Sequence, residues 1–432
     1  MQICNNIGTN EKGILTFAGR DTLELAQKYG TPLYLMDEDK IREKMRTYKN
    51  AMSKYFGNGS APIYASKAAS FKRIYGIAAE EGIGVDVVSA GEIYTAIAAG
   101  FDIANAYFHG NNKTEEEIRF AIENGIGCFV ADSMTELETI NAEAARAGKK
   151  QQVLLRITPG IDTHTNKKIA TGNVDSKFGM AIATGQAYAF TEAALKYENL
   201  TLLGYHCHVG SQVFDSETFI DAVDIMIDFS KEVKDRTGFE PEVLNLGGGF
   251  GVKYVASHPQ LDIENSIKEV GEVLDEKCRQ TGVKKPRILM EPGRSIVADA
   301  GMTLYTVGTV KQITNFKNYV AIDGGMTDNP RFALYDAEYT VVNAGKAESA
   351  KNYRCSVVGK CCESGDIIQE DVHMAKPEKG DIIAVMTTGA YNFSMASNYN
   401  RIPRPPVVML SKGEDYVAVK RETLEDIIKN DI

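Results

Sequence analysis

The stretch "APIYASKAASFKRIYGIAAEEGIGVDVVS" (61–89) decides the fold prediction, because it contains one complete strand–helix–strand unit. Its two ends, 61–67 and 84–89, are short runs of small and β-branched apolar residues, which is typical of buried strands. The residues between them have a helical pattern. Two strands that are joined through a helix pair in parallel with a right-handed crossover.

The same alternation continues along the chain and yields eight strand candidates. They are residues 61–67, 84–89, 105–110, 127–133, 152–160, 202–210, 243–249 and 287–293. Helices with apolar residues three and four apart are predicted between them, for example at 113–125, 134–149 and 216–238. Another helix, 38–55, precedes the first strand. Eight such repeats in roughly 230 residues predict a (β/α)8 barrel, and an open doubly wound sheet is the structural alternative.

A different pattern begins after residue 300, where strands are separated by turns with few helices between them. This pattern predicts an all-β barrel or sandwich. The segment "GILTFAG" (13–19) is expected to add a strand to it. We therefore predict a barrel domain over residues 30–300 and a β-domain formed by residues 1–29 and 301–432.

Composition excludes several classes of protein. The 432 residues carry a formal net charge of −10 with both signs interspersed, so no basic stripe is available for nucleic acid. No apolar run approaches the roughly 20 residues of a membrane-spanning helix, and no secretory signal is visible at the N-terminus. Seven scattered cysteines indicate reduced thiols and a cytoplasmic location.

Charged and small residues gather where the predicted barrel strands end, although the strand bodies are apolar. In a (β/α)8 barrel these C-terminal ends form the active site. The residues concerned are Lys67, Asp86, His109, Arg156, His208, Gly210, Ser211, Gly247, Gly248, Gly249, Glu291, Gly293 and Arg294.

The glycine run 247–249 matches neither a dinucleotide-binding fingerprint nor a Walker A motif. Consecutive glycines can instead aim backbone N–H groups at one anion. The nearby segments "GSQ" (210–212) and "PGR" (292–294) offer a hydroxyl, further N–H groups and a guanidinium. Three such loops together favour a phosphate site, whereas a tight turn that requires positive φ is the alternative for each glycine alone.

Lys67 has two interpretations. It can extend from the strand end into solvent, or it can be a Schiff-base lysine whose partly desolvated amine has a lowered pKa and becomes nucleophilic. Together with a phosphate site, the second interpretation indicates pyridoxal 5′-phosphate (PLP), which carries an aldehyde and a phosphate. Its electron withdrawal depends on a protonated pyridine nitrogen, and Glu291 is the candidate to hold that proton.

The pair His206 and His208 shares one face of a strand and could in principle bind zinc. The other strand ends considered for further ligands carry Lys, Gly or Arg, so we predict no metal. For His208 we favour stacking on a cofactor ring, and for His206 packing in the core.

Ten motifs in order resemble the fold-type III PLP-dependent decarboxylases over nearly the whole chain. They are "YASKA", "DVVSAGE", "FHGNNKT", "DSKFGM", "HCHVGSQ", "LNLGGGFG", "EPGRSIVADAG", "DNPRFALY", "GKCCESGD" and "GAYNFSMASNYN". The resemblance implies the alanine racemase-like combination of barrel and β-domain, with the β-domain contributing to the active site. One departure is Ala69, where the family often has asparagine.

The resemblance also implies roles for single residues. Lys67 would carry PLP, His208 would stack on its ring, and Glu291 would pair with the ring nitrogen. Asp86, Ser211, Gly247 to Gly249, Gly293 and Arg294 would surround the cofactor, and Arg294 could also meet the substrate. Cys362 resembles the family's proton donor and Tyr391 its cofactor- and substrate-contacting tyrosine. The loop after Cys362 reaches a neighbouring subunit's site in this family, which implies a homodimer.

The substrate can be argued from charge. Arg331 and Tyr335 lie four apart and share a face if the segment is helical. Arginine grips a carboxylate with two hydrogen bonds, and Glu363 could accept from an ammonium. Both charges at the distal end favour meso-2,6-diaminopimelate, giving L-lysine and CO2 as the last step of lysine biosynthesis. The alternatives are a decarboxylase of carboxynorspermidine, ornithine or arginine, an alanine-racemase-like enzyme, and an inactive regulatory homologue.

Overall fold

The computed structural model describes residues 3–161 and 176–432, and the chain divides into two compact units. The barrel unit comprises Lys44–Gly251 and Gln260–Gly293, and the β unit comprises Met1–Glu43, Val252–Pro259 and Arg294–Ile432. The predicted division at residues 30 and 300 stays a prediction. The motif that begins at Asp175 lies partly outside the described residues.

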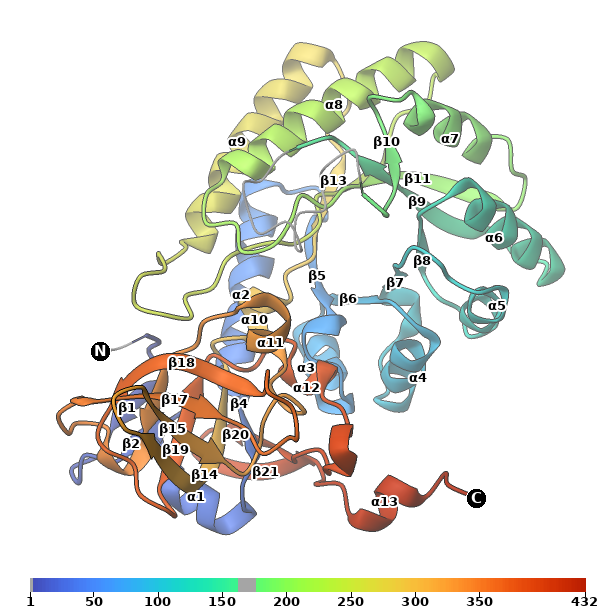
Figure 1. Ribbon diagram of the computed structural model, residues 1–432. Coiled ribbons are helices and arrows are strands. Elements are labelled where there is room, and N and C mark those ends of the chain that lie inside the picture. The colour runs from blue at the N-terminus through green and yellow to red at the C-terminus, as the bar shows by residue number, and fades with distance from the viewer. Residues whose placement is uncertain (1–2, 162–175) are drawn as a thin grey trace. The chain divides into compact units, whose positions relative to one another are not determined.

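Eight parallel strands close into a barrel in the barrel unit (Figure 1). They are β5 (Ala61–Ala65), β6 (Gly84–Val87), β7 (Ala106–Phe108), β8 (Cys128–Ala131), β9 (Gln151–Thr158), β11 (Leu200–His206), β12 (Val243–Asn245) and β13 (Arg287–Met290). Pairing runs from β9 through β11, β12, β13, β5, β6 and β7 to β8, which pairs back with β9. The short β10 (Met180–Ala181) pairs only with β9. The closed ring confirms the predicted barrel and excludes the open sheet.

Helices alternate with these strands and lie outside them (Figure 1). They are α3 (Lys72–Glu81), α4 (Ala90–Ala98), α5 (Glu115–Glu123), α6 (Met134–Arg146), α7 (Gln186–Ala194), α8 (Glu217–Thr237) and α9 (Ile263–Thr281), with the 3-10 turns η1 (Ser66–Ala68) and η2 (Ile103–Asn105). Thr114 forms a capping box with Glu117, and Ser133 accepts from the Glu136 N–H, so two of these helices begin at side-chain caps. Such regular crossovers bring all eight C-terminal strand ends to one rim.

Two sheets build the β unit. The larger has the order β18-β17-β15-β14-β4-β20-β21, and β16 joins it through β19, which pairs with β14. Its strands are β4 (Leu33–Asp37), β14 (Gly301–Ile313), β15 (Lys317–Ile322), β16 (Val341–Asn343), β17 (Tyr353–Val358), β18 (Ile367–Met374), β19 (Ile382–Met386), β20 (Val407–Ser411) and β21 (Glu414–Val419). The smaller sheet contains β1 (Ile7–Thr9), β2 (Leu15–Phe17) and β3 (Arg20–Asp21).

Short helices complete this unit. They are α1 (Thr22–Tyr29), α10 (Arg294–Val297), α11 (Arg331–Tyr335), α12 (Asn392–Met395) and α13 (Leu424–Ile428), with the turns η3 (Ala344–Lys346) and η4 (Tyr399–Arg401). Helix α2 (Glu38–Tyr55), predicted with these bounds, contains the boundary between the two units.

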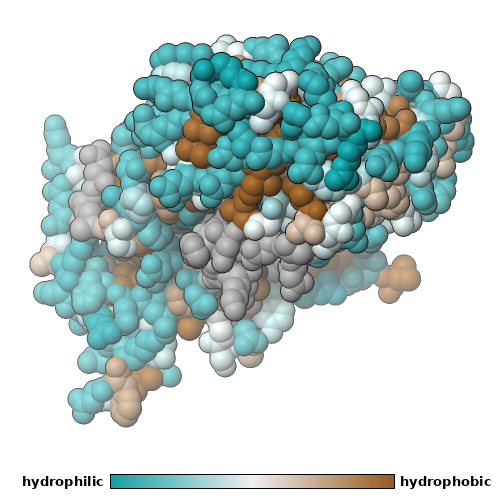
Figure 2. All heavy atoms as spheres, turned by 90° about the horizontal axis from the view of Figure 1, so that it is seen from above, coloured by the Kyte–Doolittle hydropathy of each residue, from teal (hydrophilic) through white to brown (hydrophobic). Residues whose placement is uncertain are grey.

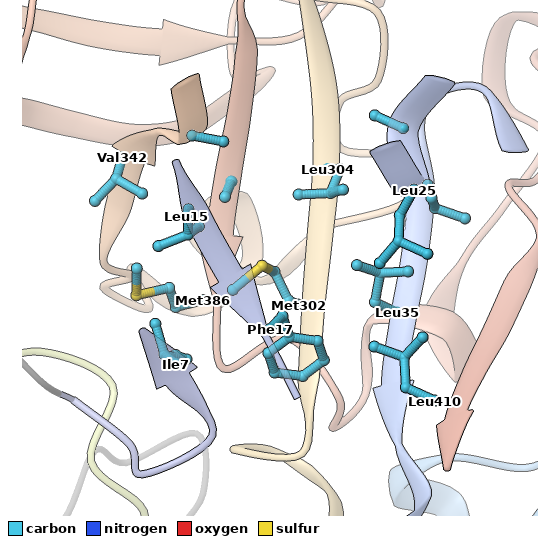
Figure 3. Packing of buried hydrophobic residues seen from close by; sticks show 14 of the residues in the cluster. Ile7, Leu15, Phe17, Leu25, Leu35, Met302, Leu304, Val342, Met386 and Leu410 are labelled. Carbon is cyan, nitrogen blue, oxygen red and sulfur yellow. The ribbon is translucent and has the colours of Figure 1, made fainter. Parts of the chain in front are cut away.

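An apolar cluster joins the two sheets of the β unit (Figure 3). Leu15 and Phe17 of β2 pack with Met302 and Leu304 of β14, and all four side chains are buried. Each fully buried side chain of this size contributes about 1.5–3 kcal/mol. The strand predicted at 13–19 therefore packs in this unit, but it belongs to the small sheet.

Within the described ranges, the structure contains no helix that is both long and apolar enough to cross a bilayer. Figure 2 shows one face on which hydrophilic residues predominate, with smaller hydrophobic patches between them.

Candidate active site

A buried carboxylate, Glu291, lies directly after β13 at the C-terminal rim of the barrel. Three side chains contact this carboxylate. Asn245, the last residue of β12, donates from Nδ2 to Oε1 at 2.7 Å. The Nε2 atoms of His109 and His206 lie 2.9 Å from Oε1 and 3.4 Å from Oε2. Neither imidazole nitrogen has hydrogen-bond geometry toward a partner among the described residues, so the two rings are close neighbours of the carboxylate without a hydrogen bond to it.

The charge of this cluster follows from its contacts. Burial raises the pKa of the Glu291 carboxyl, but His109 and His206 oppose burial and hold that pKa well below its ordinary value. Burial lowers the pKa of His206 to about 4, so its imidazole is neutral at pH 7. The rim of the barrel thus contains a buried, ionised carboxylate beside the neutral imidazole of His206.

The glycine run follows β12 and packs closely against its neighbours. A Cβ on Gly248 would lie 2.2 Å from the Glu291 carbonyl oxygen, and one on Gly249 would lie 2.5 Å from the Gly210 oxygen. The N–H of Gly247 donates to Asn245 Oδ1 at 2.9 Å, and the N–H of Gly248 donates to His208 Nδ1 at 3.3 Å. Contrary to the expectation from sequence, these two N–H groups bond to side chains and are not both aimed at one anion. Close packing explains the need for glycine here.

Lys67 lies in the turn η1 after β5 and is exposed, between the buried residues Ser66 and Ala68. Burial lowers the pKa of His208 well below its ordinary value, and the nearby Lys67 ammonium adds to this effect. His208 is thus a neutral imidazole next to both Lys67 and the glycine run. Gly293 packs against the same turn, because a Cβ there would lie 2.9 Å from Ala65 Cβ.

Asp86 is a buried residue of β6, one position before the strand ends, and lies near Lys67. Both of its carboxylate oxygens are buried and have no hydrogen-bond partner among residues 3–161 and 176–432. Burial raises its pKa, which His109, Lys67 and Arg156 oppose. Ser211 follows β11 and is half-buried. The structure therefore brings Lys67, Asp86, His208, the glycine run and Glu291 to one rim.

Two arginines and three tyrosines form a second cluster, which lies in the β unit. Arg294 Nη1 donates to Tyr254 Oη at 2.9 Å, and the Arg294 guanidinium carbon lies 4.7 Å from the centre of the Tyr391 ring. The guanidinium carbon of Arg331 lies 5.2 Å from the same ring and 5.4 Å from that of Tyr335. Arg331 and Tyr335 begin and end α11, so the predicted helical face exists.

The arginine–tyrosine cluster has features of a ligand-binding site. Arg331 is buried, and its Nε has no hydrogen-bond partner within the described part of the chain. Tyr391 has φ of 68°, a left-handed conformation that is uncommon for a bulky residue. Two cations and an aromatic ring held in this way suit an anionic ligand.

Cys362 and Glu363 are exposed in the turn between β17 and β18. The Cys362 N–H donates to Asn400 Oδ1 at 2.8 Å. Burial raises the pKa of its neighbour Cys361 to about 11, which keeps that thiol protonated. Cys362 is therefore the accessible thiol of the pair.

The chain matches a known protein family over more than half of its length. The family described as "Pyridoxal-dependent decarboxylase, pyridoxal binding domain" matches residues 38–298. A diaminopimelate decarboxylase of Bacillus methanolicus is 47% identical over 413 residues, covering 96% of this chain and 95% of that protein. The chain belongs to the diaminopimelate decarboxylase family. One from Bacillus subtilis (strain 168) is 46% identical over 423 residues, with 98% and 96% covered.

Solved structures of the diaminopimelate decarboxylase family share the fold. The enzyme from M. jannaschii in co-complex with L-lysine superposes with a TM-score of 0.91 at 36% identity, covering 100% of this chain and 99% of that one. PLP is accordingly the cofactor of this chain.

Glu291 provides an independent test of whether the residues fit PLP. A carboxylate has about four acceptor positions. Asn245 donates one hydrogen bond to Oε1, whereas the Nε2 atoms of His109 and His206 lie near the two oxygens without hydrogen-bond geometry, so acceptor positions on Glu291 stay open within the described residues. A protonated pyridine nitrogen would match this buried, ionised carboxylate with open acceptor positions. The donor set of this diaminopimelate decarboxylase family member therefore fits the ring end of the cofactor.

Two members of this set, His206 and Asn245, are missed by reasoning from the sequence, and for His109 only its place at the strand ends is predicted. Core packing is predicted for His206, and no role is predicted for His109 or Asn245, yet all three contact Glu291. The same histidines and Glu291 have ligand atoms within 4.8 Å of one another, a spacing that a metal ion could also use. The signal that could have found them is their common place at the C-terminal ends of the barrel strands β7, β11 and β12.

Proposed function

We propose that this chain is a PLP-dependent carboxy-lyase that converts meso-2,6-diaminopimelate to L-lysine and CO2, the last step of lysine biosynthesis. The observation that carries the proposal is the buried, ionised Glu291 on the same rim as Lys67, with acceptor positions that no hydrogen bond from the described residues occupies. The relatives named diaminopimelate decarboxylase, and the M. jannaschii enzyme in co-complex with L-lysine, support this substrate and product.

PLP supplies, when bound, an aldehyde that condenses with amines and a ring that accepts the electron pair left by CO2. Lys67 would hold the aldehyde and afterwards release the product. Glu291 would keep the ring nitrogen protonated, and the neutral His208 imidazole would pack on the ring. Asp86, Ser211, Gly247 to Gly249 and Gly293 would line the rest of the cofactor site.

The arginine–tyrosine cluster would bind the charged groups of the substrate. Arg331 has a buried Nε without a partner in the described chain, and it can grip the distal carboxylate through two hydrogen bonds. Arg294, Tyr335 and Tyr391 would complete this part of the site, and Glu363 would accept from the distal ammonium. An ornithine or arginine decarboxylase has no distal carboxylate to bind.

Cys362 would return the proton to the carbon that loses CO2, because it is the exposed thiol of the pair. We infer that Cys362 and Glu363 act in the site of a second copy, so that the enzyme is a homodimer. A cytoplasmic location fits the seven free cysteines.

A substrate comparison tests the function. Purified holoenzyme is expected to release CO2 from meso-diaminopimelate much faster than from ornithine, arginine or lysine. The Lys67→Ala protein is expected to lose both the visible absorbance of bound PLP and the activity. Equal rates with ornithine, or unchanged cofactor absorbance in the Lys67→Ala protein, would contradict the proposal.

The substrate cluster has its own test. Arg331→Lys keeps the charge but loses the two-point grip, which is worth about 1.5–3 kcal/mol for hydrogen bonds to charged groups. We expect KM for meso-diaminopimelate to rise roughly 10- to 150-fold with a smaller change in kcat. Arg354→Lys, at an exposed ion pair with Asp371, is the matched control and should leave KM unchanged.

Mixing two inactive variants tests the shared site. If Cys362 serves the partner's site, a mixture of Lys67→Ala and Cys362→Ala proteins forms mixed dimers that contain one intact site, and part of the activity returns. No recovery after demonstrated subunit exchange would place Cys362 in the site of its own chain.

A further inference from the structure

Asn245 lies where the glycine run and Glu291 meet, and its amide contacts both. It is fully buried at the end of β12. Its Nδ2 donates to Glu291 Oε1 at 2.7 Å, and its Oδ1 accepts from the Gly247 N–H at 2.9 Å. The Gly247 carbonyl in turn accepts from the Glu291 N–H at 2.9 Å. Three hydrogen bonds thus form a closed ring through three residues.

The ring fixes the direction of the amide. Only the oxygen of an asparagine side chain can accept a hydrogen bond, and only its nitrogen can donate one. The Gly247 N–H demands the oxygen, so the nitrogen must face Glu291. The backbone of the glycine run therefore determines that Glu291 receives a donor, and no rotation of the amide satisfies both neighbours in another way.

The donor also determines which oxygen of Glu291 stays available. Among the described residues, Asn245 and His109 contact Oε1, while His206 contacts Oε2. Other charged or titratable groups act on Glu291 from the surrounding strands, namely Asp86 on β6, Arg156 on β9, and Cys207 and His208 after β11. Among the groups that touch its oxygens, Asn245 alone cannot change its charge.

We propose that Asn245 is a positioning residue that keeps Glu291 oriented and ionised toward the pyridine nitrogen of PLP and aligns it with the glycine run. This inference rests on the proposed function, because it assumes that PLP occupies this rim. It assigns a purpose to an amide that touches neither substrate nor the reacting carbon.

Replacing the amide by a carboxylate, in Asn245→Asp, gives a distinctive expectation. The introduced carboxyl group can still accept from the Gly247 N–H, and while protonated it can still donate to Glu291. When it loses that proton, two carboxylates face each other at a hydrogen-bond distance, and their repulsion makes the pair titrate as a unit. Asn245→Asp should therefore behave nearly like the natural protein at low pH and fail as pH rises. Asn245→Ala should be defective at every pH.

The experiment measures the dissociation constant of PLP for the apoprotein from pH 5.5 to 8.5, together with kcat and KM of the holoenzymes. We expect the dissociation constant of Asn245→Ala to rise about 10- to 100-fold, the range found when supporting partners of a site are removed. For Asn245→Asp we expect a loss that grows with pH. Asn105→Asp, at an exposed position beside Asp102, is the matched control.

The outcomes separate a positioning role from a structural one. Equal defects of Asn245→Asp and Asn245→Ala at every pH, or PLP binding by both that matches Asn105→Asp, would overturn the inference. If either single variant fails to fold, the double variant Asn245→Asp/Glu291→Gln retains one amide–carboxylate pair. We expect it to regain the fold, seen by circular dichroism, without regaining PLP affinity; a double variant that regains affinity contradicts the inference.

The wild-type protein distinguishes this inference from the proposed function. If it binds no PLP and releases no CO2 from meso-diaminopimelate, the proposed function fails whatever the variants do. If it does both and the Asn245 variants match Asn105→Asp, only the role of Asn245 fails.

Discussion

Two buried carboxylates, one in each unit, carry opposite protonation preferences. Glu291 of the barrel unit has a pKa well below its ordinary value, whereas burial raises the pKa of Asp328 in the β unit to about 7. Asp328 also has three donors, since it accepts from Tyr305 Oη at 2.5 Å, the Gly325 N–H at 3.0 Å and Thr327 Oγ1 at 3.1 Å.

The number of donors therefore does not decide the charge of a buried carboxylate. Two imidazoles lie next to Glu291 and lower its pKa, against the effect of burial. Asp328 has hydroxyl and backbone donors, and the nearby Asp366 raises its pKa further. The comparison teaches that the chemical type of the neighbours decides whether a buried carboxylate is ionised or holds its proton.

The largest expected effect comes from removing the charge of Glu291. Glu291→Gln keeps the shape and loses the anion, so we expect kcat to fall by about 100- to 1,000-fold, as when one preorganised electrostatic group is removed. The free energy of unfolding should change much less, because a buried charge disappears. Steady-state kinetics and urea unfolding measure the two quantities. A variant that keeps its kcat would remove the functional half of the comparison.

Asp328→Asn should act on stability instead, and its effect should depend on pH. A folded pKa raised from 3.8 to about 7 means that the native state holds a proton that the unfolded state releases. The stabilisation that this proton gives is fully present below the pKa of Asp328 in the unfolded state. It falls as pH rises toward the pKa in the folded state, by about 1.4 kcal/mol per pH unit. The amide of Asp328→Asn does not titrate. The free energy of unfolding of this variant, relative to that of the natural protein, should therefore rise by roughly 2–3 kcal/mol between about pH 5 and 7. Urea unfolding across this range measures the gain, and a constant difference would contradict it.

His206 should give the opposite slope. Its folded pKa is lowered from 6.5 to about 4, so the unfolded chain binds a proton that the native state refuses. The stabilisation that comes from the neutral His206 imidazole is fully present above the pKa of this residue in the unfolded chain. It is lost as pH falls, by about 1.4 kcal/mol per pH unit at most. His206→Gln keeps a donor without titrating, and we expect its unfolding free energy to fall less between about pH 6.5 and 4.5. Equal acid sensitivity of both proteins would show that His206 is not the cause.

The smallest effect tests a single donor. Tyr305→Phe removes the hydroxyl that Asp328 accepts from, and a hydrogen bond to a charged group is worth about 1.5–3 kcal/mol against about 1 kcal/mol for a neutral one. The loss of stability should therefore be larger at pH 8, where Asp328 is ionised, than at pH 5. Tyr188→Phe, at the exposed pair with Glu232, is the matched control.

The barrel could be predicted because its information is local. Each strand is a short apolar run before a polar end, and all eight predicted strands are present. Lys67 and Glu291 could be singled out as candidate site residues because each is an ionisable residue at the end of an apolar strand. Their roles, like those of the other predicted site residues, stay predictions.

The strands that were not predicted depend on pairing between distant segments. The buried run of β4 (Leu33–Asp37) was not predicted as a strand, and it pairs with β14 and β20 in the β unit. The hydrogen bond from Asn245 to Glu291 depends on the register of β12 against β13, which cannot be derived from either segment alone. The strands β18 and β20 were not predicted, since polar residues interrupt the first and two prolines precede the second.

Tyr391 shows what such a site demands of the fold around it. A bulky residue at φ of 68° stores about 1–3 kcal/mol that the neighbouring structure must overcome. Glycine or asparagine at this position would relax the backbone, so the most easily stabilised version of this loop is one that has lost its aromatic ring between two arginines. Selection for thermal endurance alone would thus remove the ring on which the proposed substrate cluster depends.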